Sequence, residues 1–374
     1  MIYLDNAAAS CPKPHSVHRA VRYALDNYAA NPGRSSHKEA LKAANAVYDT
    51  RCILSQLFGA PAPENVIFTS NTTHALNIAL YTAVKKGCKV VTSVMEHNAV
   101  LRPLYALQKE RECEIRFFRP DMDNVCSTLM NFYDAARDCD VCVLTLCSNV
   151  NGYRMPIREI AEYCKKSGIT LIADGAQAAG YFDIDIQKIG IDMLCIPSQK
   201  GLFGICGAGA LIVGDKWCEK MEPMMTGGSG VMSQSREMPP YLPERLEAGT
   251  LATLPIVSMC AGAEFVDTVG TDELYYRSYT PAQYLREMLM NMRKVKVYPC
   301  YGSIVLFNVQ NAQSFEVEKL FDDGNIAVRS GFHCAPLTHE HILTGENGAV
   351  RASFGAFNSP RDAECVVKRI KSMC

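Results

Sequence analysis

The sequence predicts an α/β protein in which a large, mostly parallel sheet is followed by a smaller α+β domain. Three observations lead to this fold class. Between about residues 66 and 213, apolar strand-like runs alternate with helical patterns, which is typical of βαβ units. The chain has 374 residues, 48% of them hydrophobic, which is enough for two domains with separate cores. From residue 296 onward, short strands and helices follow a different rhythm.

Five apolar runs in the first region are expected to form strands of the large sheet. They lie at residues 66–70, 89–94, 142–147, 169–173 and 192–196. Apolar runs of this length are typical of strands that are buried on both faces of a parallel sheet. Because ligands gather at the carboxyl ends of such strands, we expect the polar residues that follow these runs to lie together.

A lysine and an aspartate stand at the ends of two of these runs. Lys200 opens the glycine-rich stretch 201–207, and Asp174 ends the run at 169–173. A lysine amine joins the aldehyde of pyridoxal phosphate as a Schiff base, and an aspartate keeps the pyridine nitrogen protonated so that the ring accepts electrons. Taken alone, the pair is a weak indication, because buried strand-end aspartates and exposed lysines are common.

Four more polar residues follow the other runs, and each has a structural reading beside a functional one. Thr72 and Thr73 begin a helix whose free backbone amides would bind a phosphate, or they simply cap that helix. His97 could stack on a flat ring and relay protons, although a lone histidine is usually structural. Asn149 offers an amide to a ring or substrate, and it is also ordinary turn chemistry.

Two residues far downstream add a nucleophile and a cation. Cys334 lies in a turn bounded by Gly331 and Pro336, where a thiol is more accessible than in a strand, and a nearby cation favours the reactive thiolate. It is the best nucleophile candidate among the 17 cysteines. Arg351 lies in an apolar segment, where a bidentate carboxylate would compensate its burial. That carboxylate belongs either to a substrate or to an aspartate of the protein.

Composition excludes several classes of function. The formal net charge is −1 and no basic block occurs, so neither nucleic acid nor a membrane surface is expected as a partner. The first residues lack the regions of a signal peptide, so we expect a cytosolic protein with reduced thiols and no disulfide framework. Cys139 and Cys142 are read as core residues, and His339-Glu340-His341 as strand or loop residues that hold no metal.

The chain is expected to divide into two domains with the ligand between them. A large cofactor-binding domain would span residues 14–255, and a small one residues 256–374 together with 1–13. Between residues 221 and 243 the composition turns to Gly, Ser, Met and Pro, which predicts a functional loop longer than ordinary connections.

The order of these residues resembles the class V aminotransferase superfamily, and more narrowly the cysteine desulfurases of group II, which include the selenocysteine lyases. The resemblance starts at residues 3–9 and runs nearly end to end. It is carried by Thr72-Thr73, Glu96-His97, Asn149, Asp174 with Gln177, Lys200, residues 247–250, Cys334 and Arg351. Three places depart from the family pattern: Phe332 replaces a histidine before Cys334, residues 197–199 read Pro-Ser-Gln, and the loop at 221–243 is shorter.

The resemblance implies the type I pyridoxal phosphate fold, with a large seven-stranded mixed and mostly parallel sheet, in a homodimer. It assigns to each site residue a role around pyridoxal 5'-phosphate. Around the ring, Lys200 would carry the Schiff base, Asp174 would pair with the ring nitrogen, Gln177 would contact the ring hydroxyl, His97 would stack on the ring, and Gln199 would replace an ionisable group beside the cofactor. Thr72 and Thr73 would hold the phosphate with help from Ser198, and Thr250 would reach the phosphate of the partner subunit. Asn149 would orient ring or substrate, and Arg351 would bind the substrate carboxylate.

The implied activity is conversion of L-cysteine to L-alanine, with a persulfide left on Cys334 for transfer to an acceptor protein or small thiol. A second hypothesis is another enzyme of the superfamily, such as a selenocysteine lyase, C–S lyase, epimerase or aminotransferase. A third is a noncatalytic scaffold, which the altered residues 197–199 motivate.

Overall fold

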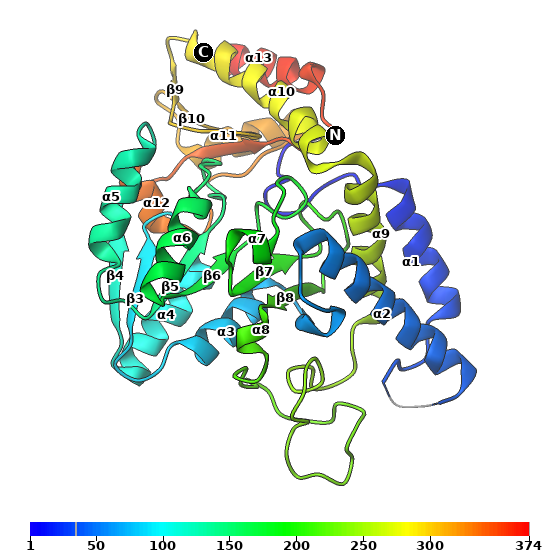
Figure 1. Cartoon of the computed structure of the whole chain (residues 1–374). Helices are drawn as coiled ribbons and strands as arrows, with labels where there is room; N and C mark the ends of the chain where they lie inside the picture. The colour runs from blue at the N-terminus through cyan, green and yellow to red at the C-terminus, as the bar shows by residue number, and fades with distance from the viewer. Residues whose placement is uncertain (34–35, 374) are drawn as a thin grey trace.

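The computed structural model describes residues 1–33 and 36–373. Seven strands form its large sheet. They are β2 (Val66–Thr69), β3 (Lys89–Ser93), β4 (Glu114–Phe118), β5 (Val141–Thr145), β6 (Thr170–Asp174), β7 (Met193–Pro197) and β8 (Gly209–Val213). Their order across the sheet is β2-β8-β7-β6-β5-β3-β4, and only β8 runs antiparallel to its neighbours. The predicted fold class, with its mostly parallel seven-stranded sheet, is confirmed (Figure 1).

Helices surround this sheet and continue into the second half of the chain. Those up to residue 218 are α1 (His15–Asn27), α2 (Lys38–Phe58), η1 (Pro63–Asn65), α3 (Thr72–Ala83), α4 (Asn98–Arg111), α5 (Val125–Ala135), α6 (Ile157–Ser167), α7 (Ile186–Ile189) and α8 (Asp215–Cys218). Those after it are α9 (Thr253–Val269), α10 (Thr271–Met290), α11 (Ser314–Asp323), α12 (Pro336–His341) and α13 (Pro360–Met373). Among the described residues, no helix has both the length and the apolar character needed to cross a membrane.

Local sequence explains where several of these helices start and stop. The side chain of Asn71 accepts a hydrogen bond from the backbone N–H of His74 and so caps α3, and Asn124 caps α5 in the same way. Gly59 and Gly168 end α2 and α6 in the left-handed conformation that glycine adopts without strain. Every residue of strands β2, β5, β7 and β8 is buried, because helices cover both faces of the sheet.

The remaining strands build two smaller sheets near the C-terminal part of the chain. Strands β9 (Val295–Val297), β10 (Ile304–Val309) and β12 (Val350–Ser353) pair antiparallel in the order β12-β10-β9, while β1 (Ile2–Tyr3) pairs in parallel with β11 (Ile326–Ala327). Helices α10 and α13 lie together over this region, at the top of Figure 1. Its own hydrophobic cluster includes Leu4, Leu306 and Phe354. The expected domain limits at residues 13 and 255 stay a prediction.

Of two local predictions, one is confirmed by the structure and one is wrong. Cys139 and Cys142 lie in the hydrophobic core, as predicted. His339-Glu340-His341 lie in helix α12, so their assignment to a strand or loop is wrong. The reason is Pro336, which starts the helix at its first position, where its fixed φ is already helical and no amide hydrogen bond is needed.

Candidate active site

The carboxyl edge of the large sheet gathers most of the polar residues that the sequence singled out. Strands β2, β3, β5, β6 and β7 point the same way. Both β2 and β7 pair antiparallel with β8, and β6, β5 and β3 follow β7 across the sheet through successive parallel pairs. Residues that follow these strands therefore share one edge. They are Thr72 after β2, His97 after β3, Asn149 after β5, Asp174 at the end of β6 and Lys200 after β7.

At this edge, the charges of Asp174 and Lys200 shift each other's pKa. Asp174 is buried, and its Oδ1 accepts a hydrogen bond from the backbone N–H of Ala176 at 2.9 Å. Burial raises the pKa of the Asp174 carboxyl, and the charge of Lys200 opposes that rise. Burial lowers the pKa of Lys200 to about 8, against the opposing charge of Asp174. A large share of the amine is therefore neutral near pH 8, and the neutral amine is the nucleophile.

Close backbone contact holds the Lys200 loop against the turn that follows Asp174. A Cβ on Gly201 would lie 2.1 Å from the carbonyl oxygen of Ala179, and a Cβ on Gly180 would lie 2.0 Å from the carbonyl oxygen of Gly201. Neither position accepts a side chain. The glycine after the lysine thus lets the loops after β6 and β7 touch directly, which fixes the position from which the Lys200 side chain starts.

Two buried hydroxyls lie where α3 begins and β7 ends. Thr72 Oγ1 and Ser198 Oγ have no hydrogen-bond partner in the described part of the chain. They lie at the same end of three adjacent strands, because Thr69 of β2 and Pro197 of β7 both pair with Gly209 of β8. Buried polar groups normally have partners, so unpartnered hydroxyls at a helix N-terminus fit the oxygens of a phosphate group.

Thr73 and Gln199, which follow these two residues in the sequence, have other surroundings. Thr73 is exposed, and its carbonyl accepts a hydrogen bond from Asn77 at 2.7 Å. Gln199 Oε1 is buried without a partner among the residues described, while the Gln199 carbonyl accepts hydrogen bonds from the backbone of Ser10 and from Lys13 Nζ, both at 2.9 Å. The segment 197–199 is therefore held in place by the N-terminal part of the chain.

His97 presents a neutral ring at the start of α4. It caps this helix through Nδ1, which accepts a hydrogen bond from the backbone N–H of Ala99 at 3.0 Å. Burial, followed by the positive charges of Lys200 and Arg329, lowers the pKa of His97 to about 4. Since Nδ1 is an acceptor, we assign the proton to Nε2. A neutral, oriented imidazole is suited to stacking on a flat ring and to proton relay.

The N-terminal segment 5–10 runs through the site and links it to the small sheets. The Asp5 carboxylate lies 2.6 Å from Arg351 NH2 on β12. The Gln177 side chain donates a hydrogen bond to the Ala7 carbonyl at 2.8 Å. Gln177 thereby lies beside the segment 5–10, and the stretch that opens the chain becomes a wall of the site.

Arg351 is the most deeply placed cation of this group. It is 1% exposed, and NH1 donates to the Asn149 carbonyl at 2.7 Å while NH2 pairs with Asp5. Its Nε is buried and has no partner within residues 1–33 and 36–373. The sequence left open whether a substrate carboxylate or an aspartate of the protein pairs with Arg351. The structure provides the protein's own Asp5, and the Nε–H remains for another oxygen.

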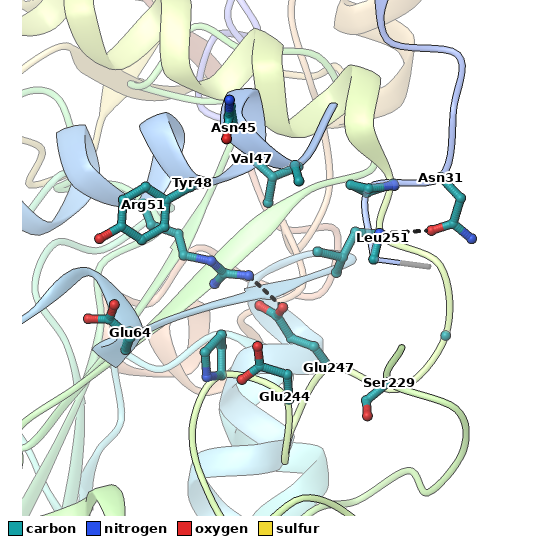
Figure 2. A pocket seen from close by; sticks show the side chains of 15 residues that line it. Asn31, Asn45, Val47, Tyr48, Arg51, Glu64, Ser229, Glu244, Glu247 and Leu251 are labelled. Atoms are coloured by element: carbon teal, nitrogen blue, oxygen red, sulfur yellow. Dashed lines mark hydrogen bonds and ion pairs between the residues drawn. The ribbon is translucent and has the colours of Figure 1, made fainter. Parts of the chain in front are cut away.

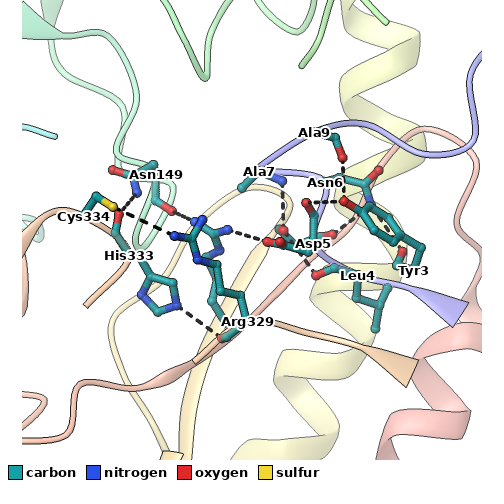
Figure 3. Close-up of polar contacts among 12 residues, drawn as sticks. Tyr3, Leu4, Asp5, Asn6, Ala7, Ala9, Asn149, Arg329, His333 and Cys334 are labelled. Carbon is teal, nitrogen blue, oxygen red and sulfur yellow. Dashed lines mark hydrogen bonds and ion pairs between the residues drawn. The ribbon is translucent and has the colours of Figure 1, made fainter. Parts of the chain in front are cut away.

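Cys334 lies in a turn that is tied to the edge of the large sheet. The Asn149 side chain donates to the His333 carbonyl at 2.8 Å, and the backbone N–H of Asn98 donates to the Cys334 carbonyl at 2.7 Å. The thiol is exposed, and Arg329 NH2 lies 3.9 Å from its sulfur (Figure 3). An accessible thiol facing a guanidinium is the surrounding in which a cysteine reacts as a nucleophile.

Thr250 is the site candidate that lies elsewhere. It is exposed and accepts a hydrogen bond from Asn31 at 3.2 Å, beside the connection between α1 and α2. A neighbouring pocket of about 340 Å³, shown in Figure 2, is lined by residues of this connection, of α2 and of the segment that leads to Thr250. At its base, Arg51 NH2 lies 2.5 Å from Glu247 Oε2, and both side chains are buried. This pair anchors the segment that carries Thr250.

The Glu247→Ala variant is expected to lower the free energy of unfolding by about 3 to 5 kcal/mol, because it leaves the Arg51 charge buried without its partner. It also removes the acceptor of the Phe68 backbone N–H, which donates to Glu247 Oε1 at 2.6 Å. Urea denaturation followed by circular dichroism measures the change. Glu244→Ala is the matched control, since Glu244 lines the same pocket. An equal loss in both variants would contradict this role of the buried pair.

Sequence reasoning did not assign Asp5, Arg329 and His339 to the site. Asp5 contacts Arg351, Arg329 contacts Cys334, and His339 lies behind His333 at 3.0 Å between ring nitrogens. Arg329 lies five residues before Cys334, so its position in the same turn was the available indication. Asp5 is 346 residues from Arg351, and only the fold brings the two together.

Comparison with known proteins identifies what this arrangement is similar to. The family model "Aminotransferase class-V" matches residues 2–366. The probable cysteine desulfurase of Methanothermobacter thermautotrophicus is 28% identical and aligns over 100% of this chain and 94% of its own length. The cysteine desulfurase of Haloferax volcanii is 27% identical, over 99% and 88%.

Solved structures agree with these relatives. The apo structure of cysteine desulfurase from Thermococcus onnurineus NA1 superimposes with a TM-score of 0.91 at 27% identity, and covers 100% of this chain and 94% of the other. A cysteine desulfurase from Escherichia coli gives a TM-score of 0.86 at 24% identity, over 99% and 94%, and supports the fold.

Proposed function

This chain belongs to the aminotransferase class V family, and from that membership we propose that it is a pyridoxal phosphate-dependent cysteine desulfurase. It would convert L-cysteine to L-alanine and hold the removed sulfur as a persulfide on Cys334. The observation that carries the proposal is the exposed Cys334 thiol beside Arg329, in a turn that hydrogen bonds to Asn149 at the edge where Lys200 and Asp174 lie.

The residues at this edge fit pyridoxal 5'-phosphate. The hydroxyls of Thr72 and Ser198, together with Thr73 and the N-terminus of α3, would hold its phosphate. Asp174 would pair with the ring nitrogen, and Gln177 would contact the ring hydroxyl. His97 would stack on the ring, and Gln199 would lie beside it. When bound, the cofactor supplies an aldehyde that joins amines and a ring that accepts electrons from a substrate carbanion.

Lys200 would have two tasks, and its lowered pKa supports both. As a neutral amine it is the attachment point for the aldehyde, and once released it would take the α proton of the substrate. A pKa of about 8 is close to the range in which a general base works best at neutral pH. Asp174 contributes a carboxylate whose charge favours a protonated ring nitrogen.

Arg351 would bind the substrate carboxylate through the Nε donor that the protein leaves unpartnered among the described residues. Asp5 neutralises part of its charge, and Arg329 adds a second cation nearby, so the three groups together keep one positive charge for an anionic substrate. Asn149 would orient the substrate or the ring, because its carbonyl holds Arg351 and its amide holds the Cys334 turn.

Cys334 would then attack the sulfur of L-cysteine. A bond forms between the two sulfurs, the carbon–sulfur bond of the substrate breaks, and the electron pair of that bond stays on the carbon that becomes the methyl group of alanine. Arg329 NH2 faces the attacking sulfur at 3.9 Å. The exposed position of Cys334 supports onward transfer of the persulfide to an acceptor protein or a small thiol.

We further propose that the protein is a cytosolic homodimer in which Thr250 of one subunit reaches the phosphate of the other. The exposed side chain of Thr250, outside the edge that holds Thr72 and Ser198, supports this arrangement. The division into domains 14–255 and 256–374 with 1–13 is part of the same proposal.

The products formed from L-cysteine test the proposed reaction. The purified protein with added pyridoxal phosphate and a reductant is expected to release alanine and sulfide in equal amounts. Pyruvate in place of alanine would identify a C–S lyase, and D-cysteine an epimerase. In a parallel assay with an added 2-oxo acid as amino acceptor, a keto acid that keeps its sulfur would identify an aminotransferase. A preference for L-selenocysteine over L-cysteine would identify a selenocysteine lyase. A protein that binds no cofactor would be the scaffold.

A further inference from the structure

Behind Cys334 lie two histidine rings that the proposed reaction does not use. His333 and His339 are 3% and 1% exposed, and their ring planes are nearly parallel, with centroids 5.2 Å apart and an interplanar angle of 21°. His339 belongs to α12, and His333 precedes the nucleophile directly. Phe332, which replaces a histidine of the family pattern, packs its ring edge-on against His339 at 5.4 Å.

The hydrogen bonds of these rings run in one direction. His333 Nε2 lies 3.2 Å from the Arg329 carbonyl oxygen, which can only accept, so we assign a proton to this nitrogen. Burial lowers the pKa of His339 to about 4 and that of His333 well below its usual value, so both rings are neutral. His333 Nδ1 therefore accepts from His339 Nε2 at 3.0 Å, and His339 Nδ1 accepts from the Thr344 hydroxyl at 2.9 Å.

This chain of hydrogen bonds supports an unfavourable backbone conformation at the nucleophile. His333 and Cys334 have φ of 50° and 58°, in the left-handed region that residues with a Cβ rarely adopt. Two consecutive residues of this kind persist only where the surroundings hold them. Asn149 and Asn98 bind their carbonyls, and the ring of His333 ties the turn back to Arg329, whose guanidinium faces the Cys334 sulfur.

We propose that His339 and Thr344 are positioning residues that, through His333, keep the Cys334 turn left-handed and its thiol beside Arg329. The proposal rests on the proposed function insofar as Cys334 is the nucleophile. His339 acts on the reacting sulfur only through its hydrogen bond with His333. It supplies the one N–H that satisfies the buried Nδ1 of His333 and thereby fixes which way that ring faces.

The test compares His339→Leu with His339→Gln in the full-length protein loaded with pyridoxal phosphate. Leucine removes both ring nitrogens, whereas the glutamine amide can still donate to His333 and accept from Thr344. His341→Gln is the matched control, because His341 is on the same helix but bonds to the Pro120 carbonyl instead. Each variant is measured for kcat and KM of alanine release, for cofactor absorbance, and for the rate at which iodoacetamide alkylates Cys334, located by peptide mass spectrometry.

We expect His339→Leu to lower kcat by about 10- to 100-fold, as a displaced reacting group does, with KM and cofactor absorbance unchanged. The rate of Cys334 alkylation at pH 7 should differ several-fold from the native rate, because the loosened turn moves the sulfur from its place beside Arg329. His339→Gln should recover most of both rates, and His341→Gln should match the native protein. Native rates in a folded His339→Leu, or equal losses in the leucine and glutamine variants, would overturn the proposal.

Two provisions keep this test decisive. If His339→Leu does not fold, Thr344→Val against Thr344→Ser asks the same question, since serine keeps the hydroxyl that His339 Nδ1 accepts from. If the native protein releases no alanine, the proposed function fails. The alkylation rates still decide whether the histidine pair positions Cys334, because they require no turnover.

Discussion

The Lys200→Ala variant is expected to lose covalent attachment of pyridoxal phosphate and to form alanine from L-cysteine at least about 10³-fold more slowly than the native protein. In the proposed reaction, the substitution removes both the amine that would join the aldehyde and the base that would take the substrate's α proton. Both tasks depend on the position of Lys200 after β7, where burial lowers its pKa to about 8. Absorbance of the purified protein, borohydride reduction followed by intact mass, and alanine release measure the loss.

Lys188→Ala is the control for this substitution. Lys188 is an exposed lysine on α7 that pairs with Asp185, so its removal should leave cofactor attachment and alanine release unchanged. If the Lys200→Ala protein still retained the cofactor after borohydride reduction, another amine would be the attachment point and the assignment of Lys200 would be wrong.

The pKa of Lys200 also predicts how fast the cofactor-free protein takes up pyridoxal phosphate. The attacking species is the neutral amine, whose fraction rises with pH until the pKa is passed. Uptake should therefore accelerate between pH 6 and about 8 and change little above that. For an ordinary exposed lysine, whose pKa lies near 10.4, the rate would keep rising well beyond pH 9.

Five strands of the large sheet, β2, β3, β5, β6 and β7, could be located from the sequence because they read as mostly apolar runs. Strand β4, which is only partly buried, and strand β8 were not singled out. The direction of β8 depends on the length of the connection between β7 and β8. A parallel strand needs a crossover of a dozen or more residues, usually a helix. Residues 198–208 form turns only, so β8 returns antiparallel to β7. Helix α12 was missed because a helix of 6 residues has too few apolar positions to show a period.

In the candidate site, likewise, some residues could be predicted from the local sequence, whereas others depend on contacts between distant parts of the chain. Residues that follow strands, such as Asp174 and Lys200, could be grouped from the sequence because parallel strands end at one edge. The partner of Arg351 could not be predicted, because a buried guanidinium can pair with a carboxylate from any part of the chain. Asp5 comes next to Arg351 only because β1 pairs with β11 and Asp5 itself forms a bridge with Ser353. The tautomers of His333 and His339 likewise depend on acceptors that the fold supplies.

Cys334→Ser is expected to reduce alanine formation from L-cysteine by about 10³-fold or more while it leaves cofactor binding intact. Serine has nearly the shape of cysteine and keeps the backbone contacts of the turn to Asn98 and Asn149. Its hydroxyl does not attack sulfur. Mass spectrometry of the native protein after brief exposure to L-cysteine should find one added sulfur atom on the Cys334 peptide, and none on the variant.

Cys126→Ser and Cys206→Ser are the controls, because both thiols are exposed and neither lies in the Cys334 turn. Native activity in these variants, beside its loss in Cys334→Ser, would assign the nucleophile to one thiol among many. Alanine release at the native rate by Cys334→Ser would exclude Cys334 from the reaction and leave Lys200 and Asp174 in an enzyme with another way of removing sulfur.

The identity of any residual product in Cys334→Ser separates the two ways of breaking the carbon–sulfur bond. Attack on sulfur leaves the bond's electron pair on carbon, so the carbon skeleton ends as alanine. Without a thiolate to accept the sulfur, the bond breaks only if the pair leaves with sulfide, and the skeleton then ends as pyruvate and ammonia. We therefore expect the variant's slow turnover to shift from alanine to pyruvate, because in the proposed reaction the thiol beside Arg329 is the group that accepts the sulfur.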